Sequence, residues 1–164
     1  MNSSPTTPSI KPPRSRYVRL MNLYEDNYWR LTRVLGPERL TAGRYLSRTG
    51  DGFDLHLAMA PRCPYTLEFE LSYALPDPDS GTRMPSAIVR LYRDAQLAEV
   101  LACYGARRIE DVIGRAAPSA EVINHRLRMN GFFNKWLDYL EGAGHSRFSL
   151  TPVALVENML DAHP

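Results

Sequence analysis

Two amphipathic segments near opposite ends of the chain most constrain its fold. From Leu20 to Leu35 apolar residues recur at intervals of three and four, and Gly36 and Pro37 follow as a stop signal. A second segment with one apolar stripe runs over residues 122–140. A helix with such a stripe has to bury it against another element. The chain is therefore predicted to form two long helices that need a common partner.

Short extended runs separated by turn residues lie between these helices. The runs cover residues 44–48, 53–60, 65–75 and 86–93, and glycine or proline stands between successive runs. This punctuation is typical of an antiparallel meander. The predicted fold class is α+β, with an antiparallel sheet of about four or five strands packed against the N-terminal and C-terminal amphipathic helices.

The segment from Val89 to Val100 is the most informative for function. Alternate residues of a strand point to the same face, so Arg90, Tyr92 and Asp94 would form one polar row while the residues between them face a core. The continuation over residues 96–104 fits a short helix, and it also fits a returning strand.

A hairpin is one way in which this segment can fold. If residues 94 and 95 formed a two-residue turn, Arg90 would lie opposite Glu99 and Tyr92 opposite Leu97. Asp-Ala is a poor sequence for such a turn, so a bent or bulged strand is the alternative interpretation.

Length and composition indicate one domain with short appendages. The chain has 164 residues, of which 44% are hydrophobic and 23% charged, as in globular proteins. We expect a disordered tail rich in Pro, Ser and Thr at 1–16, a single domain at 17–146, and a C-terminal extension with a short helix at 147–164. Three positive charges lie in the tail, so the formal net charge of +2 leaves −1 for the other residues. A general nucleic-acid-binding surface is therefore not expected.

Targeting segments and metal sites are not indicated either. The chain contains neither the apolar run of a secretory signal nor the long apolar stretch of a membrane-spanning helix. Cys63 and Cys103 lack metal-ligand spacing, so we predict reduced thiols, a cytoplasmic location, and no metal or cofactor. His125 fits either a base or an interfacial side chain, and His145 lies in a terminal segment; we favour a structural role for both. Asp51 fits a turn.

Several groups of residues stand out in order along the chain. They are Met21-x-Leu23-x-Glu25-x-Asn27-Tyr28, Leu31 to Leu35, Tyr65-Thr66, Val89 to Val100, and Asn130-x-Phe132-x-x-x-Trp136-Leu137-x-Tyr139. Together they resemble the YqiB-like family of bacterial proteins, a domain of unknown function, over about residues 17–146. The resemblance implies a cytoplasmic protein of Gram-negative bacteria. It also implies a gene near those for a cyclic-AMP phosphodiesterase and an ADP-ribose Nudix hydrolase, an association that suggests nucleotide signalling.

Two interpretations apply to the row of Arg90, Tyr92 and Asp94 with Glu99 nearby. An arginine fork matches phosphate and a tyrosine can stack or donate, which predicts a site for a small anionic ligand such as a nucleotide or second messenger. The alternative is an ion pair between Arg90 and Glu99 on the sheet surface, with Tyr92 half-buried beside it. We favour the ion pair, because such pairs are common on exposed sheets.

Asn130, Trp136 and Tyr139 form a candidate structural motif on the second helix. The helical spacing of Trp136 favours core packing over an aromatic platform. Asn130 and Tyr139 are polar residues near the apolar stripe, where they would cap an element or bridge to the sheet.

The leading functional hypothesis is a non-enzymatic regulatory or interaction protein with a protein partner. The sequence contains none of the common hydrolase, zinc-protease, dinucleotide or P-loop motifs. A binder of a small anionic ligand is the first alternative. The second alternative is an enzyme that uses Asp94 or Glu99 as an acid or base. The sequence provides neither a nucleophile nor a set of metal ligands to accompany these two residues.

Overall fold

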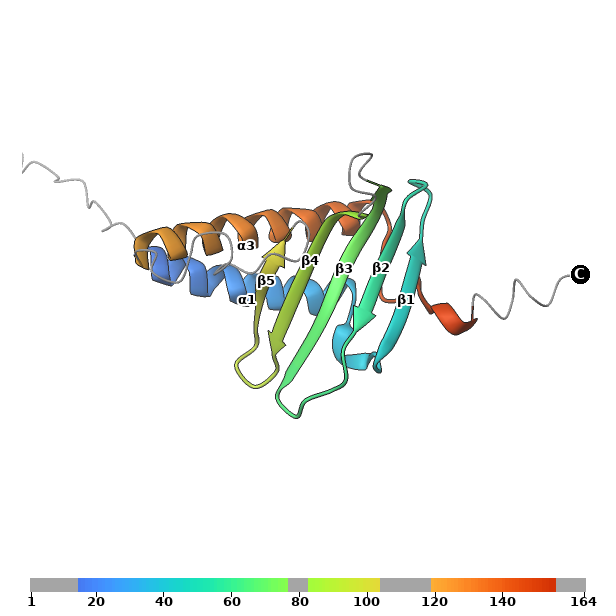
Figure 1. Ribbon diagram of the computed structural model, residues 1–164, viewed down its shortest axis with the longest axis horizontal. Coiled ribbons are helices and arrows are strands. Elements are labelled where there is room, and N and C mark those ends of the chain that lie inside the picture. Colours follow the sequence, from blue (N-terminus) through green and yellow to red (C-terminus); the bar gives the residue numbers. More distant parts are fainter. Residues whose placement is uncertain (1–14, 77–82, 104–118, 156–164) are drawn as a thin grey trace, which may run out of the picture.

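The structure, a computed structural model, describes residues 15–76, 83–103 and 119–155. Helix α1 (Arg16–Val34) comes first and is followed by a short 3₁₀ turn, η1 (Pro37–Arg39). Five strands come next: β1 (Gly43–Arg48), β2 (Asp54–Met59), β3 (Thr66–Pro76), β4 (Arg83–Tyr92) and β5 (Leu97–Cys103). Helix α3 (Ser119–Gly142) and strand β6 (Leu150–Pro152) follow (Figure 1). The tail is expected to be disordered, and its residues up to position 14 lie outside the described part of the chain.

The strands form one antiparallel sheet in the order β5-β4-β3-β2-β1-β6. The α+β class and the antiparallel pairing are confirmed, but the predicted count of four or five strands is too low, since the described sheet has six. The additional strand is β6, which lies in the segment expected to be a C-terminal extension and pairs with β1 through Thr151 opposite Leu46. Three residues are too few to show an alternating pattern, and Thr-Pro reads in sequence as the start of a helix.

The first helix begins and ends at clear local signals. Ser15 stands at its N-cap, where the side-chain oxygen accepts a hydrogen bond from the Val18 N–H at 3.2 Å. At the other end Gly36 adopts a left-handed backbone (φ 57°), and its N–H donates to the Leu31 carbonyl at 3.0 Å. The stop predicted at Gly36 and Pro37 is confirmed.

Helices α1 and α3 lie side by side on one side of the sheet and run in the same direction (Figure 1). The direction follows from their contacts, because Arg30 pairs with Asp138 and, one turn later on both helices, Arg33 pairs with Glu141. Both helices also contact β5. Since a whole meander separates them in the chain, no short turn forces them to be antiparallel.

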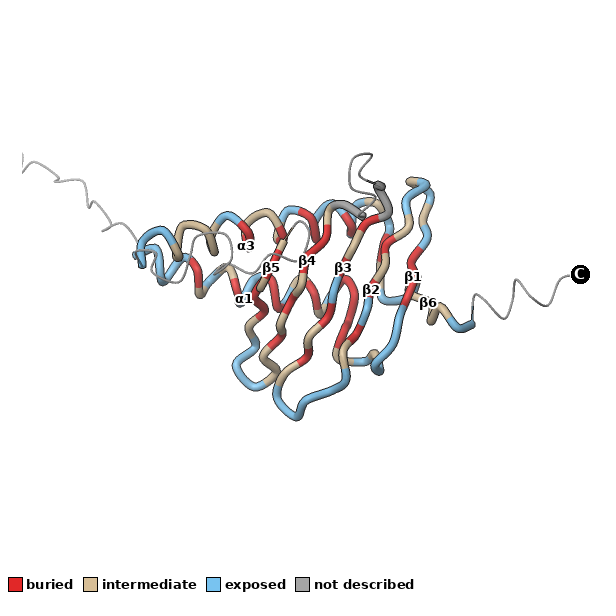
Figure 2. Tube along the Cα trace, in the orientation of Figure 1, coloured by how far each residue is buried: buried red, intermediate tan, exposed pale blue. Residues whose placement is uncertain are grey.

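A single hydrophobic cluster joins both helices to one face of the sheet. Along β2, Leu55, Leu57 and Met59 are buried while His56 and Ala58 are not, which is the alternation of a strand with one covered face (Figure 2). The opposite side of the sheet, turned away from the helices, is called the open face here. From β1 to β4 it carries the side chains of Arg44, Ala58, Glu68, Glu70, Ile88, Arg90 and Tyr92.

Trp136 is buried in this core, as its helical spacing predicted, with 5% of its surface exposed. We expect Trp136→Ala to lower the free energy of unfolding by about 3–5 kcal/mol, because it removes a large buried side chain and leaves a cavity. Urea denaturation followed by circular dichroism measures the loss. Trp29→Ala is the matched control, since Trp29 is 48% exposed; equal losses in the two variants would contradict a core role for Trp136.

Candidate functional site

Strands β4 and β5 form the hairpin that the sequence allowed as one of two alternatives. The turn spans residues 93–96, and Gln96 takes a left-handed backbone with φ of 54°. Tyr92 lies opposite Leu97 and Arg90 opposite Glu99, which is the register expected for a hairpin. Residues 97–103 are therefore a strand and not a helix. A register shift also occurs, but it lies further along, between Ile88 and Val89.

Four charges alternate in sign across the open face at this hairpin, and we call them the charge ladder: Glu68, Arg90, Glu99 and Arg126. Register places Glu68 opposite Arg90, and Arg90 opposite Glu99. Arg126 reaches Glu99 from helix α3. The ladder joins β3, β4, β5 and a helix, and its formal charges sum to zero.

The prediction of an ion pair between Arg90 and Glu99 is wrong, because each of these residues pairs with a different partner. Arg90 Nη2 lies 2.9 Å from Glu68 Oε2, and Arg126 Nη1 lies 3.0 Å from Glu99 Oε2. Arg90 thus has a carboxylate on each side and pairs with the one from β3. The sequence could not indicate this choice, because it depends on a strand and a helix far from the motif in the chain.

Glu99 is the least exposed member of the ladder, and Tyr92 binds it. The Tyr92 hydroxyl donates to Glu99 Oε1 at 2.6 Å, so both oxygens of this carboxylate are bound. Burial, and then the hydrogen bond to Glu99, raises the pKa of Tyr92 above its ordinary value. The hydrogen bond that Arg90 donates to Glu68 similarly raises the pKa of Arg90. Tyr92 therefore stays protonated and Arg90 stays charged at neutral pH.

Asp94, the remaining member of the predicted row, lies apart from the ladder. It is exposed in the turn, where its Oδ1 accepts a hydrogen bond from the Ala95 N–H at 2.9 Å. An aspartate that bonds to neighbouring backbone is typical of turns. The structure thus brings together Arg90, Tyr92 and Glu99, and leaves Asp94 outside.

A shallow hollow of about 300 Å³ lies next to the ladder on the open face. Its lining includes Ala58, Ala60, Glu68, Glu70 and Ile88. Two carboxylates therefore border a partly apolar floor. An anion site at Arg90 would need a pocket lined by positive charge, but this one is lined by two carboxylates.

The predicted structural motif on α3 has two buried members and one exposed member. Asn130 is fully buried, and its Oδ1 accepts a hydrogen bond from the Val100 N–H of the sheet at 2.9 Å. Trp136 is in the core, whereas Tyr139 is 52% exposed and meets Tyr73 edge-on. The bridge to the sheet predicted for Asn130 is present.

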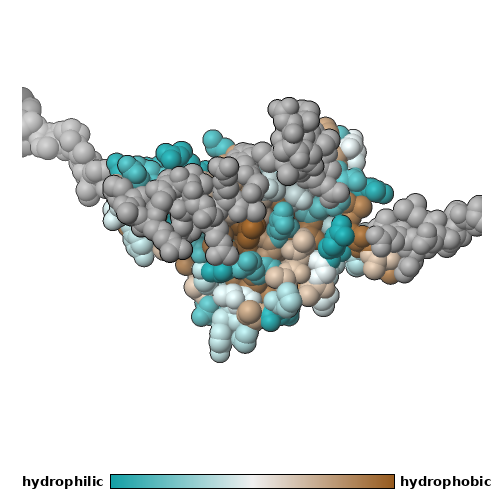
Figure 3. Space-filling model, viewed as in Figure 1, coloured by the Kyte–Doolittle hydropathy of each residue, from teal (hydrophilic) through white to brown (hydrophobic). Residues whose placement is uncertain are grey.

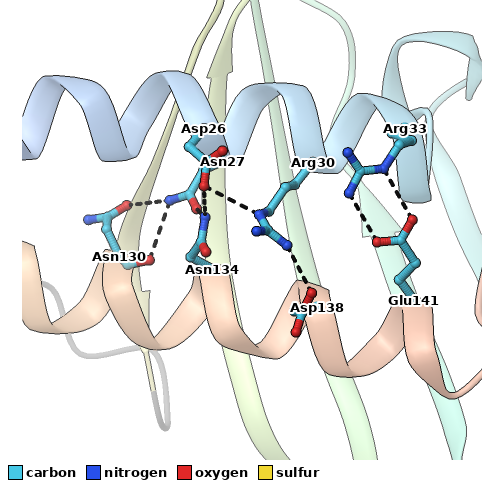
Figure 4. Close-up of polar contacts among 8 residues, drawn as sticks. All are labelled: Asp26, Asn27, Arg30, Arg33, Asn130, Asn134, Asp138 and Glu141. Carbon is cyan, nitrogen blue, oxygen red and sulfur yellow. Dashed lines mark hydrogen bonds and ion pairs between the residues drawn. The ribbon is translucent and has the colours of Figure 1, made fainter.

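Asn130 also belongs to a polar seam between the two helices (Figure 4). The amide of Asn27 on α1, itself fully buried, donates to Asn130 Oδ1 at 3.4 Å and accepts from Asn134 at 3.0 Å. Further along, Arg33 binds Glu141 through two hydrogen bonds of 3.1 and 3.0 Å. The alternation of buried amides and exposed ion pairs aligns the helices in one register.

A second polar cluster was missed by the sequence analysis and surrounds His145, which is only 1% exposed. Its Nδ1 lies 2.8 Å from Ser47 Oγ, and its Nε2 lies 3.7 Å from Asp51 Oδ2. The Tyr73 hydroxyl donates to the same Asp51 oxygen. Ser47 and His145 are 98 positions apart, so no spacing in the sequence could have indicated the cluster.

The His145 cluster has the residue types of a hydrolytic triad but not the accessibility. Ser47 is fully buried, so its hydroxyl cannot reach a substrate. Desolvation lowers the pKa of His145, while the hydrogen bond from Tyr73 lowers the pKa of Asp51. A neutral histidine beside a charged aspartate ties the segment after α3 to β1 and β3, which is a structural role.

Two absences concern the described residues alone. In the three described ranges, no group of three or more His, Cys, Asp or Glu side chains could hold a metal ion. Within the same ranges, neither helix combines the length and the apolarity needed to span a membrane.

We expect the two halves of the ladder to differ in strength. A double-mutant cycle for Glu68 and Arg90 should give a coupling of about 1 kcal/mol or less, because both side chains are well exposed. A cycle for Glu99 and Arg126 should give about 1.5–3 kcal/mol, because the Glu99 side chain is only 11% exposed. Urea denaturation of the four single and two double alanine variants measures both couplings, and equal values would contradict this ranking.

We expect the stability of the protein to fall as pH drops below about 6.5, partly because of His145. Its pKa is lowered from 6.5 in the folded state, so the unfolded chain binds the proton first and the stabilisation present above 6.5 is lost as pH falls. The free energy of unfolding between pH 7 and 5 measures this loss. His145→Asn keeps a polar atom near Ser47 and cannot titrate, so it should lose less; an identical pH profile would refute the assignment. Burial also lowers the pKa of His125, so His125→Asn is measured alongside to separate its contribution to the pH profile from that of His145.

Comparison with known proteins places the chain in a family but assigns no activity. The model of a family described as "Protein of unknown function (DUF1249)" matches residues 30–146, a range that contains the whole charge ladder and His145. Neither a curated protein nor a solved structure matches the chain. Nothing in the family match ties the chain to the YqiB name. The match covers most of the 164 residues, and the chain therefore belongs to the DUF1249 family of proteins of unknown function.

Proposed function

We propose that this protein is a non-enzymatic interaction protein that binds a protein partner through the open face of its sheet. The observation that carries the proposal is the neutral charge ladder. Each of its cations is paired with a carboxylate of the same molecule, at 2.9 Å for Arg90 and 3.0 Å for Arg126. An incoming phosphate would have to displace one of these carboxylates before it could use the arginine fork.

The surroundings of the ladder also argue against a small anion. The adjoining hollow is bordered by Glu68 and Glu70, and Glu70 forms no ion pair with any residue in the described ranges. An anion placed there would be repelled by an uncompensated carboxylate. The same place suits a partner that brings a positive charge.

An acid or base role for Asp94 or Glu99 gains little support from their contacts. Asp94 is exposed in a turn, with neither a nucleophile nor a metal site described beside it. Both oxygens of Glu99 are bound by Tyr92 and Arg126, which leaves neither oxygen free. A general base needs a free oxygen within reach of a substrate proton.

The open face has the mixed character of a protein-binding surface. Ile88 and Ala58 lie in the same cross-strand row as the exposed Glu70. Figure 3 shows the side of the molecule that carries this face, with hydrophobic patches set between hydrophilic ones. An apolar surface surrounded by polar groups is typical of interaction sites.

Site-specific photo-crosslinking in cells that express the chain tests the proposal. A crosslinking amino acid at position 58, on the open face, should yield a defined adduct, whereas the same residue at position 22, exposed on α1, should not. Glu70→Lys combined with the crosslinker at 58 should abolish the adduct, because it reverses the charge beside the hollow. Adducts of equal yield at both positions, or none at either, would contradict the proposal.

A thermal-shift screen against nucleotides and second messengers tests the alternative of an anionic ligand. A ligand that binds only the folded state raises the melting temperature. We expect no shift from any of them. A shift that Arg90→Ala removes, while the melting temperature of the free variant is unchanged, would establish an anion site at the ladder and overturn the proposal.

A further inference from the structure

One row of side chains runs straight across the open face, and its two charges have no partner among the described residues. Register places Arg44 opposite Ala58, Ala58 opposite Glu70, and Glu70 opposite Ile88. Arg44 and Glu70 are both exposed, and neither forms an ion pair within the described ranges. The row therefore differs from the neighbouring charge ladder, where every charge is matched internally.

The small side chain of Ala58 separates the two charges. Adjacent strands lie about 4.8 Å apart, so Arg44 and Glu70 stand about 10 Å apart on either side of β2. Above Ala58 and towards Ile88 lies the shallow hollow of about 300 Å³. An arginine stem is apolar and its head is charged, so a hollow with an apolar floor and Glu70 at its rim fits an arginine that arrives from above.

The row is complementary to itself. A two-fold axis that lies over β2 and parallel to it exchanges the two sides of the row while keeping the strand direction. Arg44 of one copy then faces Glu70 of the other, and the same pair forms again on the opposite side of the axis. Every contact of this kind occurs twice, as an isologous interface requires.

We propose that the occupant of the open face is a second copy of this chain, packed sheet against sheet about the axis over β2. Arg44 of each copy enters the hollow of the other, lays its stem over Ala58 and Ile88, and pairs with Glu70. Sheets packed face to face lie about 10 Å apart, a gap that a side chain as long as arginine spans. This inference rests on the proposed interaction role of the open face and names its partner.

Charge reversal at the two positions tests the homodimer. Sedimentation equilibrium should show the full chain at twice the 18.6 kDa of one chain. Arg44→Glu alone and Glu70→Arg alone each place two like-charged pairs in the interface, so each should weaken the dimer more than about 100-fold and sediment as a monomer. Arg39→Glu, which changes an exposed charge in η1, an element outside the sheet, is the matched control and should leave the dimer intact.

Mixing the two variants gives the decisive measurement. In a complex of one Arg44→Glu chain with one Glu70→Arg chain, both ion pairs form again. Between the two substituted positions the charges are exchanged, and between the two unchanged positions they are as in the wild type. The equimolar mixture should therefore form a dimer although neither variant does alone. The double variant Arg44→Glu/Glu70→Arg should likewise dimerise. Circular dichroism and melting temperature of each variant verify that the chains are folded.

The outcomes separate this inference from the proposed function. A monomeric wild-type chain, a dimer that resists both reversals, or a mixture that stays monomeric would each overturn the two-fold dimer. If the crosslinker at position 58 nevertheless yields an adduct with a different protein, the open face is an interaction surface for that protein. If it yields an adduct of two identical chains that Glu70→Lys removes, both the interaction role and the dimer are supported.

Discussion

The hydrogen bonds of the buried Asn130 side chain are the interactions on which the arrangement of this molecule most depends. Its Oδ1 accepts from the Val100 N–H at the outer edge of strand β5 and from Asn27 of the first helix, while its Nδ2 donates to the Arg126 carbonyl one turn earlier. One amide thus connects both helices and the sheet. Because a buried polar group without partners is costly, this geometry specifies one relative placement of three elements that apolar packing alone would leave less well defined.

The open face follows from that placement. Two parallel helices cover one side of the sheet, and on the other side alternate residues such as Arg44, Ala58 and Glu70 are exposed. At the β5 end these residues form a ladder whose charges cancel, and Arg126 extends from α3 to complete it. In the neighbouring row, Arg44 of β1 and Glu70 of β3 remain unmatched within the described chain. The charges of the ladder are neutralised within the molecule and those of this row are not, which indicates where a partner would bind.

The His145 cluster shows how a polar site can serve the fold and not chemistry. Its members come from β1, the following turn, β3 and the segment after α3, and they close on one another away from solvent. The cluster lies next to β6, whose pairing with β1 extends the sheet beyond the meander. Burial of a neutral histidine against a charged aspartate is stable only while these segments remain packed, which couples the end of the described chain to the sheet.

The sequence by itself determined those features that depend on residues close together in the chain. The apolar stripes predicted both long helices, the glycine and proline punctuation predicted the meander, and the alternation in Val89 to Val100 predicted which side chains share a face. The register that places Arg90 opposite Glu99 belonged to the hairpin, one of the alternatives that the sequence left open. Only the tertiary structure decided the features that depend on distant residues: the pairing of Arg90 with Glu68 and of Glu99 with Arg126, the sixth strand, and the cluster around His145. The physical reason is that periodicity specifies which face a side chain occupies, whereas its partner is chosen by whichever group the packing of the whole chain brings within hydrogen-bonding distance.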